Sequence, residues 1–171
     1  METVKENTAD EYLNKLIQRL EAEGYDVESD IEYKDKKFEY FAKRKRFEID
    51  KFNCKFNVFV FSRFSSLDVD TLKDYSSQAF RYAVSSTIRP LYRNLFCLRY
   101  CYPVAIVDSL DSSVINYIRR KTAPPHPFIG FEMQAVYSLE AGELYYCEDS
   151  PMLGWLYFNE MQSIMNAMLA P

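Results

Sequence analysis

Glycine is scarce in this sequence, which holds four glycines, at positions 24, 130, 142 and 154. Phosphate-cradling loops and dinucleotide-binding turns need closely spaced glycines before a helix, so neither motif is present. Histidine occurs once, as His126 within Pro-Pro-His-Pro, and no Gly-x-Ser-x-Gly elbow exists. A hydrolase that pairs a serine or cysteine nucleophile with a histidine base is therefore not expected.

Long apolar runs are also missing. No stretch approaches the ~18 residues that a membrane-spanning helix needs, and the start, METVKENTADEYL, lacks the layout of a secretory signal. We therefore expect a cytoplasmic protein with no membrane segment. Hydrophobic residues make up 48% and aromatic residues 16%, which is too apolar for disorder. The length suits a single globular domain spanning residues 1–171.

The four cysteines (Cys54, Cys97, Cys101 and Cys147) are interpreted as reduced, mostly buried thiols, as is usual in the cytosol. Cys97 and Cys101 are four residues apart, which is not the spacing of three in a zinc knuckle. A zinc site built from all four thiolates is the alternative. The residues by themselves predict no cofactor.

Charge is distributed unevenly along the chain. Residues 1–33 carry ten acidic and three basic side chains, whereas residues 34–55 carry nine basic and four acidic ones. A local basic block can contact phosphate or an acidic partner. The alternative is a solvated hairpin whose bases face the acidic N-terminal helix.

The first predicted element is a helix from Thr8 to Glu23. Thr8 and Glu11 have the spacing of a capping box, in which two side chains satisfy the open amides of a first helical turn. Apolar residues recur every three or four positions through this segment. Gly24 suits the left-handed position that follows a helix.

Strands are predicted for residues 27–33 and 38–42, with residues 47–52 as a third strand or as the continuation of the second. The Lys-Arg-Lys-Arg run at 43–46 lies between them as a charged strand end or a turn. Residues 55–64, KFNVFVFSRF, are apolar on both faces at their centre, which is typical of the middle strand of a covered sheet.

The second half alternates helices and strands. A helix is expected from Asp68 or Asp70 to about Thr87, followed by a strand within 95–107, for which 102–107 is favoured. Next are a helix from Asp111 or Ser112 to about Lys121 and a proline-rigid loop at 122–128. A hairpin of 131–139 and 143–146 and a helix at 157–169 complete the chain. The fold class is α/β or α+β, with a mixed central sheet flanked by helices.

Paired carboxylates are the main candidate for chemistry. Glu48 and Asp50 are two residues apart in a predicted strand, so they share a face about 7 Å apart. With Lys51 or Lys55 nearby, such a pair can hold Mg²⁺ for phosphodiester hydrolysis. The alternative is an edge strand that carries solvated charge.

Residues 8–88 resemble the core of the PD-(D/E)XK, or restriction-endonuclease-like, nuclease superfamily in the order of their predicted elements. Phe47-Glu48-Ile49-Asp50 stands where that family places a metal-binding aspartate, and Val58–Phe61 stands on its central strand. Gln78 and Tyr82 match the Gln-x-x-x-Tyr of some members. The resemblance implies a nuclease-like fold and, for an active enzyme, Mg²⁺ as the cofactor.

The chain lacks the catalytic Glu-x-Lys motif that this family carries on its central strand. In place of Glu-x-Lys it has Phe61-Ser62-Arg63, or Phe59-Val60-Phe61 in a shifted register. The second carboxylate is then missing, and Arg63 stays protonated and cannot act as a base. The resemblance therefore implies a nuclease-like domain without its catalytic set.

Three functions follow as hypotheses. The first is a non-catalytic protein-interaction or scaffold domain, one form of which associates with itself. The second is a metal-dependent nuclease with displaced carboxylates, using Glu48, Asp50 and Glu39. The third is a nucleic-acid-binding module using residues 34–55. Its candidate phosphate contacts are Lys43, Arg44, Lys45, Arg46 and Arg63. The dense aromatics from Tyr145 to Phe158 indicate either an apolar pocket or an interface.

Overall fold

The computed structural model describes residues 2–48, 53–87, 97–120, 130–149 and 155–170. Its elements, in chain order, are α1 (Glu2–Ala22), β1 (Asp26–Tyr33), β2 (Lys36–Glu48), β3 (Asn53–Phe64), α2 (Val69–Thr87), β4 (Cys97–Val107), α3 (Ser112–Arg120), β5 (Phe131–Glu132), β6 (Ala135–Ser138), β7 (Glu143–Tyr146) and α4 (Trp155–Leu169).

The strands form one mixed sheet of seven strands, in the order β1-β2-β3-β4-β6-β7, with β5 also paired to β4. β2 pairs antiparallel with both β1 and β3, whereas β3, β4 and β6 run parallel to one another. β7 returns antiparallel to β6 through the expected hairpin. The mixed sheet flanked by helices confirms the predicted α/β or α+β class.

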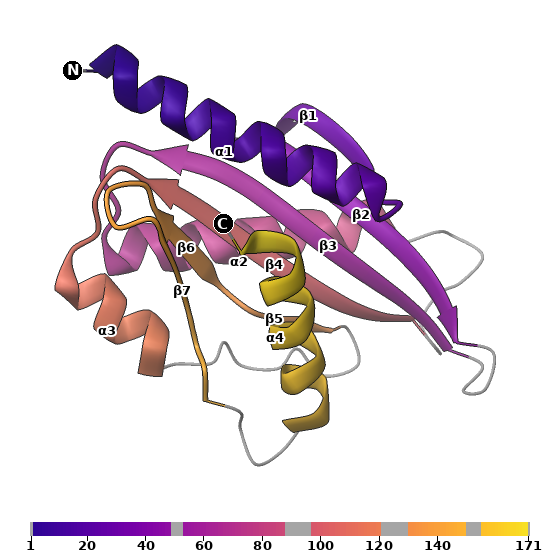
Figure 1. Cartoon of the computed structure of the whole chain (residues 1–171). Helices are drawn as coiled ribbons and strands as arrows, with labels where there is room; N and C mark the ends of the chain where they lie inside the picture. The colour runs from indigo at the N-terminus through magenta and orange to yellow at the C-terminus, as the bar shows by residue number, and fades with distance from the viewer. Residues whose placement is uncertain (1, 49–52, 88–96, 121–129, 150–154, 171) are drawn as a thin grey trace.

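Helices cover both faces of the sheet (Figure 1). α1 and α4 lie on one face, and α2 and α3 on the other. Successive residues of β3 enter the two cores alternately: Phe59 and Phe61 pack under α1 and α4, whereas Val58 and Val60 pack under α2. All four are fully buried, which confirms that β3 is a central strand covered on both sides.

β2 is one continuous strand rather than two. Lys43 pairs with both β1 and β3, and residues 44–46 pair with β3, where Arg44 lies opposite Asn57. The Lys-Arg run is therefore strand and not a turn. Its charge is compatible with pairing because a strand's backbone hydrogen bonds lie in the plane of the sheet, while the side chains leave that plane.

α1 begins at Glu2, so the predicted capping box at Thr8 is wrong. Thr8 lies inside the helix, where its backbone amide is already within the helical hydrogen-bond pattern. The segment before Thr8 contains no glycine or proline to stop the helix, and acidic residues near its start favour the positive end of the helix dipole. The helix ends as predicted, with Gly24 at a φ of 80°.

Aspartates cap the two helices behind the sheet. Asp68 Oδ1 accepts a hydrogen bond from the Thr71 amide at 2.7 Å, and Asp111 Oδ1 accepts one from the Ser113 amide at 2.7 Å. These bonds select Asp68 over Asp70, and Asp111 over Ser112, as the capping residues. The bond from the Thr71 amide lowers the pKa of Asp68, and hydrogen bonds from the Ser113 hydroxyl and amide lower the pKa of Asp111, since they stabilise the ionised forms.

Two strand boundaries differ from the sequence prediction. β4 begins at Cys97, five residues before the predicted Tyr102. The predicted strand at 131–139 is divided into β5 and β6, and between them the Met133 amide bonds to the Cys101 carbonyl at 2.9 Å. The proline-rich segment 122–128 lies outside the described residues. None of the helices in the described part of the chain is long and apolar enough to cross a membrane.

Candidate functional site

The first turn of α4 carries an exposed apolar surface. Trp155, Leu156 and Tyr157 expose 53%, 63% and 44% of their surfaces, and they are the large exposed hydrophobics of the described residues. The next residue, Phe158, is buried. We call the three exposed residues the α4 tip. Single exposed apolar side chains are ordinary, but adjacent ones at the same place are typical of contact sites.

Buried contacts hold the tip in place. Further along α4, residues at helical spacing pack into the sheet: Phe158, Met161, Met165, Met168 and Leu169. At the tip itself, the Tyr157 ring stacks on Phe131 of β5 with 4.8 Å between centroids. Phe131 also meets the Phe158 ring edge-on at 5.8 Å. The exposed side chains therefore stand on a supported helix end, which reduces the entropy that a partner would have to remove on binding.

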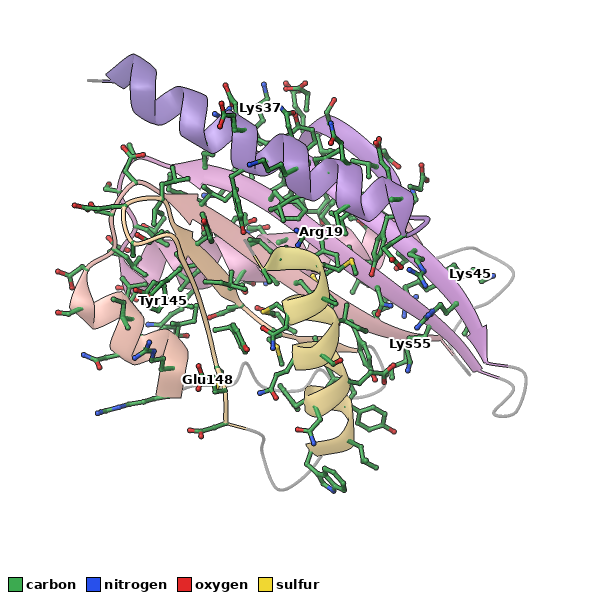
Figure 2. All side chains as sticks on the ribbon, viewed as in Figure 1. Arg19, Lys37, Lys45, Lys55, Tyr145 and Glu148 are labelled. Carbon is green, nitrogen blue, oxygen red and sulfur yellow. The ribbon has the colours of Figure 1, made fainter. Side chains whose placement is uncertain are left out.

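The segment after β7 is attached to the same helix. Gln162 Nε2 donates to the carbonyl oxygens of Cys147 at 3.1 Å and Glu148 at 2.9 Å. The Tyr146 hydroxyl donates to Asn166 Oδ1 at 2.9 Å. Figure 2 shows Glu148 on this segment, beside the lower part of α4. Gln162 lies seven residues after Trp155, and thus on the same side of the helix.

A buried ion pair joins the other side of α4 to the sheet (Figure 2). Lys55 Nζ donates to both carboxylate oxygens of Glu160 at 2.8 Å, and the Tyr100 hydroxyl donates to Glu160 Oε2 at 2.9 Å. The Lys55 side chain is 5% exposed. The sequence pattern suggested Lys55 as a helper of the Glu48–Asp50 pair. The structure instead places it as an anchor for α4.

Two further buried tyrosines, Tyr25 and Tyr102, belong to the core on this face of the sheet. Burial raises the pKa of Tyr25 to about 12, although Arg44 and Arg46 partly oppose the shift. Burial also raises the pKa of Tyr102 well above its usual value. These hydroxyls therefore stay protonated near neutral pH.

The basic run at 43–46 does not form one patch. Lys43 Nζ binds Glu28 at 2.5 Å and lies 3.4 Å from Asp26, both on β1. Arg44 Nη1 binds the Glu23 carbonyl at 2.6 Å and its carboxylate at 3.3 Å. These contacts favour the alternative of a charged hairpin whose bases are neutralised by acidic neighbours.

Strand geometry separates the run further. Consecutive residues of β2 point to opposite faces, so Lys43 and Lys45 share one face while Arg44 and Arg46 share the other. Lys45 and Arg46 are exposed. Figure 2 shows Lys45 near the far end of β2 and Lys37 close to the opposite end. The structure therefore does not bring the predicted phosphate contacts together on one surface.

Arg63 forms an ion-pair cluster with two carboxylates. Its Nε donates to Glu39 Oε2 at 2.8 Å and its Nη1 to Asp10 Oδ1 at 2.7 Å. The backbone amide of Arg63 also donates to Glu39 Oε1 at 3.1 Å. Hydrogen bonds to Glu39 are the main cause of the raised pKa of Arg63. The cluster unites α1, β2 and β3, and the sequence reasoning missed Asp10.

The carboxylates of the predicted metal site are not brought together. Glu48 is the last residue of β2 and pairs with Asn53, while Glu39 lies near the start of the same strand, about 30 Å away along the strand. One ion therefore cannot bind both. Asp50 and Lys51 lie outside the described residues, so the pairing of Glu48 with Asp50 stays a prediction.

Gln78 and Tyr82 lie on α2 and face the β1–β2 hairpin. The Tyr82 ring contacts Phe41 edge-on at 4.8 Å and Tyr33 at 5.2 Å. Hydrogen bonds from Lys36, and to a smaller degree from Gln78, lower the pKa of Asp74. The ring contacts give Tyr82 a packing role, and the hydrogen bond connects Gln78 to Asp74, four residues earlier on the same helix.

Two buried polar contacts involve α2. Glu132 is 5% exposed and accepts a hydrogen bond from the Ser76 hydroxyl. Arg99, which is 8% exposed, donates through Nε to Thr87 Oγ1 at 2.7 Å. No spacing in the sequence marks these residues, because they come from α2, β4 and β5. The one signal available in the sequence is the position of Glu132 between the apolar residues Phe131 and Met133 of a predicted strand.

A four-thiolate zinc site does not fit the strand geometry. Cys97 and Cys101 lie on one extended strand, four residues and thus about 13 Å apart. The thiolates of one zinc ion must all lie about 2.3 Å from it, so these two positions cannot serve the same ion. The described residues contain no group of three or more histidine, cysteine, aspartate or glutamate side chains that could hold a metal.

No protein-family model, no curated protein and no solved structure matches this chain.

Proposed function

We propose that the chain is a non-catalytic protein-interaction domain that contacts its partner through the α4 tip. The observation that carries the proposal is the run of three exposed hydrophobic residues, Trp155, Leu156 and Tyr157, on a helix end supported by buried contacts. Aromatic residues in such positions are enriched among the side chains that contribute most to binding.

The size of the tip fits an anchor. A half-exposed aromatic side chain presents about 100 Å², so the three residues together present on the order of 300 Å². Stable dimers bury about 800 Å² on each partner. The tip alone is therefore too small to hold two copies together. It suits the central contact of a larger interface or the docking of a short apolar segment from another protein.

The Arg63 cluster supports the non-catalytic part of the proposal. In the nuclease resemblance, Phe61-Ser62-Arg63 takes the place of Glu-x-Lys. Here the Arg63 guanidinium bridges Asp10 and Glu39, the two carboxylates beside it. A cation from the chain itself then neutralises the charge that would otherwise attract a metal ion. We propose that this part of a nuclease-like domain holds α1 on the sheet.

The test uses a property of the composition: the chain has one tryptophan, and it is Trp155. Its emission therefore reports on the α4 tip alone. Proteins captured by the wild-type chain from its host are identified, purified singly and titrated against it. A partner that covers the tip shifts the emission to shorter wavelength and protects it from acrylamide quenching.

Two variants complete the test. Substitution of Trp155, Leu156 and Tyr157 by serine removes the apolar surface. Substitution of Asn14, Gln18 and Glu21 by alanine alters three exposed residues at helical spacing on α1 and serves as the matched control. We expect the first variant to lose the captured partner and the second to keep it. If both variants retain it, or if Trp155 emission stays unchanged at saturation, the tip is not the contact surface.

A further inference from the structure

The two sides of the α4 tip differ in the charges beside them. Leu156 and Tyr157 stand four and three residues before Glu160, so they lie on the side of the helix that carries Glu160. The Glu160 side chain is 38% exposed and binds Lys55 of β3, the contact that anchors α4 to the sheet. This side of the tip therefore adjoins the strands β3 and β2.

Arg46 lies next to this anchor, one strand further out. It is the register partner of Lys55, and facing positions of paired strands belong to the same side of a sheet. Because Lys55 reaches Glu160 on α4, Arg46 also belongs to the side of the sheet that α1 and α4 cover. The Arg46 side chain is exposed.

The other bases on this side are matched by carboxylates of the chain. Lys55 binds Glu160, and Arg44, two residues before Arg46, binds Glu23. Among the residues that the structure describes, no carboxylate forms an ion pair with Arg46. An exposed guanidinium in this state can accept a carboxylate from another molecule, which it binds through two parallel hydrogen bonds.

The opposite side of the tip has no such bias. Glu148 and Asp149 are exposed there, on the segment after β7 that is attached to α4. The exposed Arg119 and Arg120 end α3 nearby, since the Cys147 Sγ lies 3.6 Å from the Arg119 carbonyl oxygen. Two acids and two bases balance each other on that side, so charge distinguishes the Arg46 side alone.

We infer that the partner of the α4 tip is a short segment of another protein that places large apolar side chains on the tip and a carboxylate on Arg46. The inference rests on the proposed function of the tip. It adds the chemistry of the partner and the direction in which its chain runs, from α4 toward β2. The apolar part supplies the buried area, and the ion pair at the rim favours acidic segments over basic ones.

The geometry limits the spacing within such a segment. Residues four apart on a helix have Cβ atoms about 6 Å apart, and neighbouring strands lie about 4.8 Å apart. With the Lys55–Glu160 ion pair between them, Leu156 and Arg46 are separated by a path on the order of 15–20 Å. An extended chain covers this in about five or six residues.

The first experiment selects random peptides of about 12 residues, twice the estimated span, on the immobilised full-length chain at low salt. A parallel selection uses the variant Trp155→Ser, Leu156→Ser, Tyr157→Ser. We expect the wild-type chain to enrich peptides that combine aromatic or aliphatic residues with Asp or Glu about five or six positions away. The triple variant should enrich none of these.

The second experiment titrates a synthetic enriched peptide by calorimetry. Arg46→Glu should weaken binding about tenfold, since repulsion replaces an ion pair. Lys45→Glu makes the same charge change at the neighbouring exposed position, on the other face of β2, and should change the Kd less than about twofold.

A neutral peptide controls for effects on folding. With its Asp and Glu replaced by Asn and Gln, the same peptide should bind the wild-type chain about tenfold more weakly and should not distinguish the wild type from Arg46→Glu. The comparison of the two peptides on the wild-type chain decides the role of the carboxylate even if Arg46→Glu does not fold.

The results separate this inference from the proposed function. Enriched peptides without Asp or Glu, or equal effects of Arg46→Glu and Lys45→Glu, would overturn the acidic partner and leave the tip as the contact surface. Peptides that bind the triple variant as tightly as the wild type would overturn both. Sedimentation that shows a wild-type dimer, absent in the triple variant, would identify a second copy as the occupant and overturn the acidic segment. A selection that enriches no peptide would also overturn it.

Discussion

Two lysines on neighbouring strands show how differently one residue type is used in this sheet. Lys55 on β3 and Lys43 on β2 each form short contacts with carboxylates. The Lys55 side chain is 5% exposed and that of Lys43 is 28% exposed. Lys55 connects the sheet to α4, a helix more than 100 residues away in the chain, whereas Lys43 connects adjacent strands of one hairpin.

We infer from this contrast that burial, more than the number of contacts, determines how much stability is lost when one partner of an ion pair is removed. A charge taken out of water depends on its partner, so removal of one partner leaves a costly uncompensated charge. An exposed pair exchanges its contact for water at little cost. Substitutions at Lys55, Arg63, Lys43 and Asp68 can test the contrast, and they are described from the largest expected effect to the smallest.

Removal of Lys55 should be the most damaging of these changes. Lys55→Ala deletes a buried side chain and leaves the Glu160 carboxylate with the Tyr100 hydroxyl and water. We expect a loss of about 2–3 kcal/mol in the free energy of unfolding, below the full range for buried pairs because Glu160 is 38% exposed. Urea denaturation measures the loss.

A double variant distinguishes charge from packing at the same place. Lys55→Met combined with Glu160→Leu removes both charges and keeps the apolar volume. We expect it to be more stable than Lys55→Met alone, since no unmatched carboxylate remains. If the double variant is the less stable of the two, an unmatched Glu160 is not costly, and if it is less stable than the wild type, the buried pair is a net source of stability.

Arg63 should have an intermediate effect, because its cluster is partly exposed but joins three elements. Arg63→Ala removes contacts to Asp10 and Glu39, and we expect a loss of about 1 kcal/mol. Arg63→Lys keeps the charge but not the two-sided geometry and should recover part of this loss. Thermal unfolding of the Arg63→Ala variant with and without millimolar Mg²⁺ shows whether the two carboxylates then accept a metal. A Mg²⁺-dependent rise in the wild-type Tm would contradict the idea that Arg63 already neutralises them.

Lys43 should have little effect. Its partners Glu28 and Asp26 are 44% and 69% exposed, so Lys43→Ala should cost about 0.5 kcal/mol or less. Chemical denaturation beside the Lys55 variants makes the comparison direct. A loss as large as that of Lys55→Ala would mean that burial does not explain the difference between the two lysines.

The contribution of the helix cap Asp68 to the stability of the fold should depend on pH. Its folded pKa is lowered by the hydrogen bond from the Thr71 amide, so its contribution is present above the unfolded value of about 4 and is lost as pH falls through the folded value. Asp68→Asn keeps an acceptor but does not titrate. Wild-type Tm should therefore fall more than that of the variant between about pH 6 and about pH 3, and equal losses would contradict this role.

Elements whose sequence is strongly patterned were predicted well. β3 was identified because four adjacent apolar residues need two covered faces, and the end of α1 and the start of α2 followed from Gly24 and Asp68. The start of α1 was missed because a capping-box spacing also occurs inside helices. β2 was divided in the prediction because charged residues interrupt its apolar pattern, although pairing with β3 continues through them.

The candidate sites were less predictable. The basic run was visible in the sequence, but its division between two faces and its pairing with Glu28 and Glu23 depend on the register of β2. The dense aromatics from Tyr145 to Phe158 are visible in the sequence, but their pattern is equally compatible with a pocket and with an interface. Trp155 and Leu156 expose 53% and 63% of their surfaces, which favours the interface, because side chains that line a closed pocket are covered.

Local spacing and residue types were enough to establish the fold class, most of the elements and the lack of several catalytic motifs, because each of these depends on neighbours in the chain. The contacts between distant residues are visible only in the tertiary structure. They join Lys55 with Glu160 and Arg63 with Asp10, and they place β3 beside β4. Such pairings arise from strand order and register, which are set by the burial of whole faces of the sheet and leave no local trace in the chain.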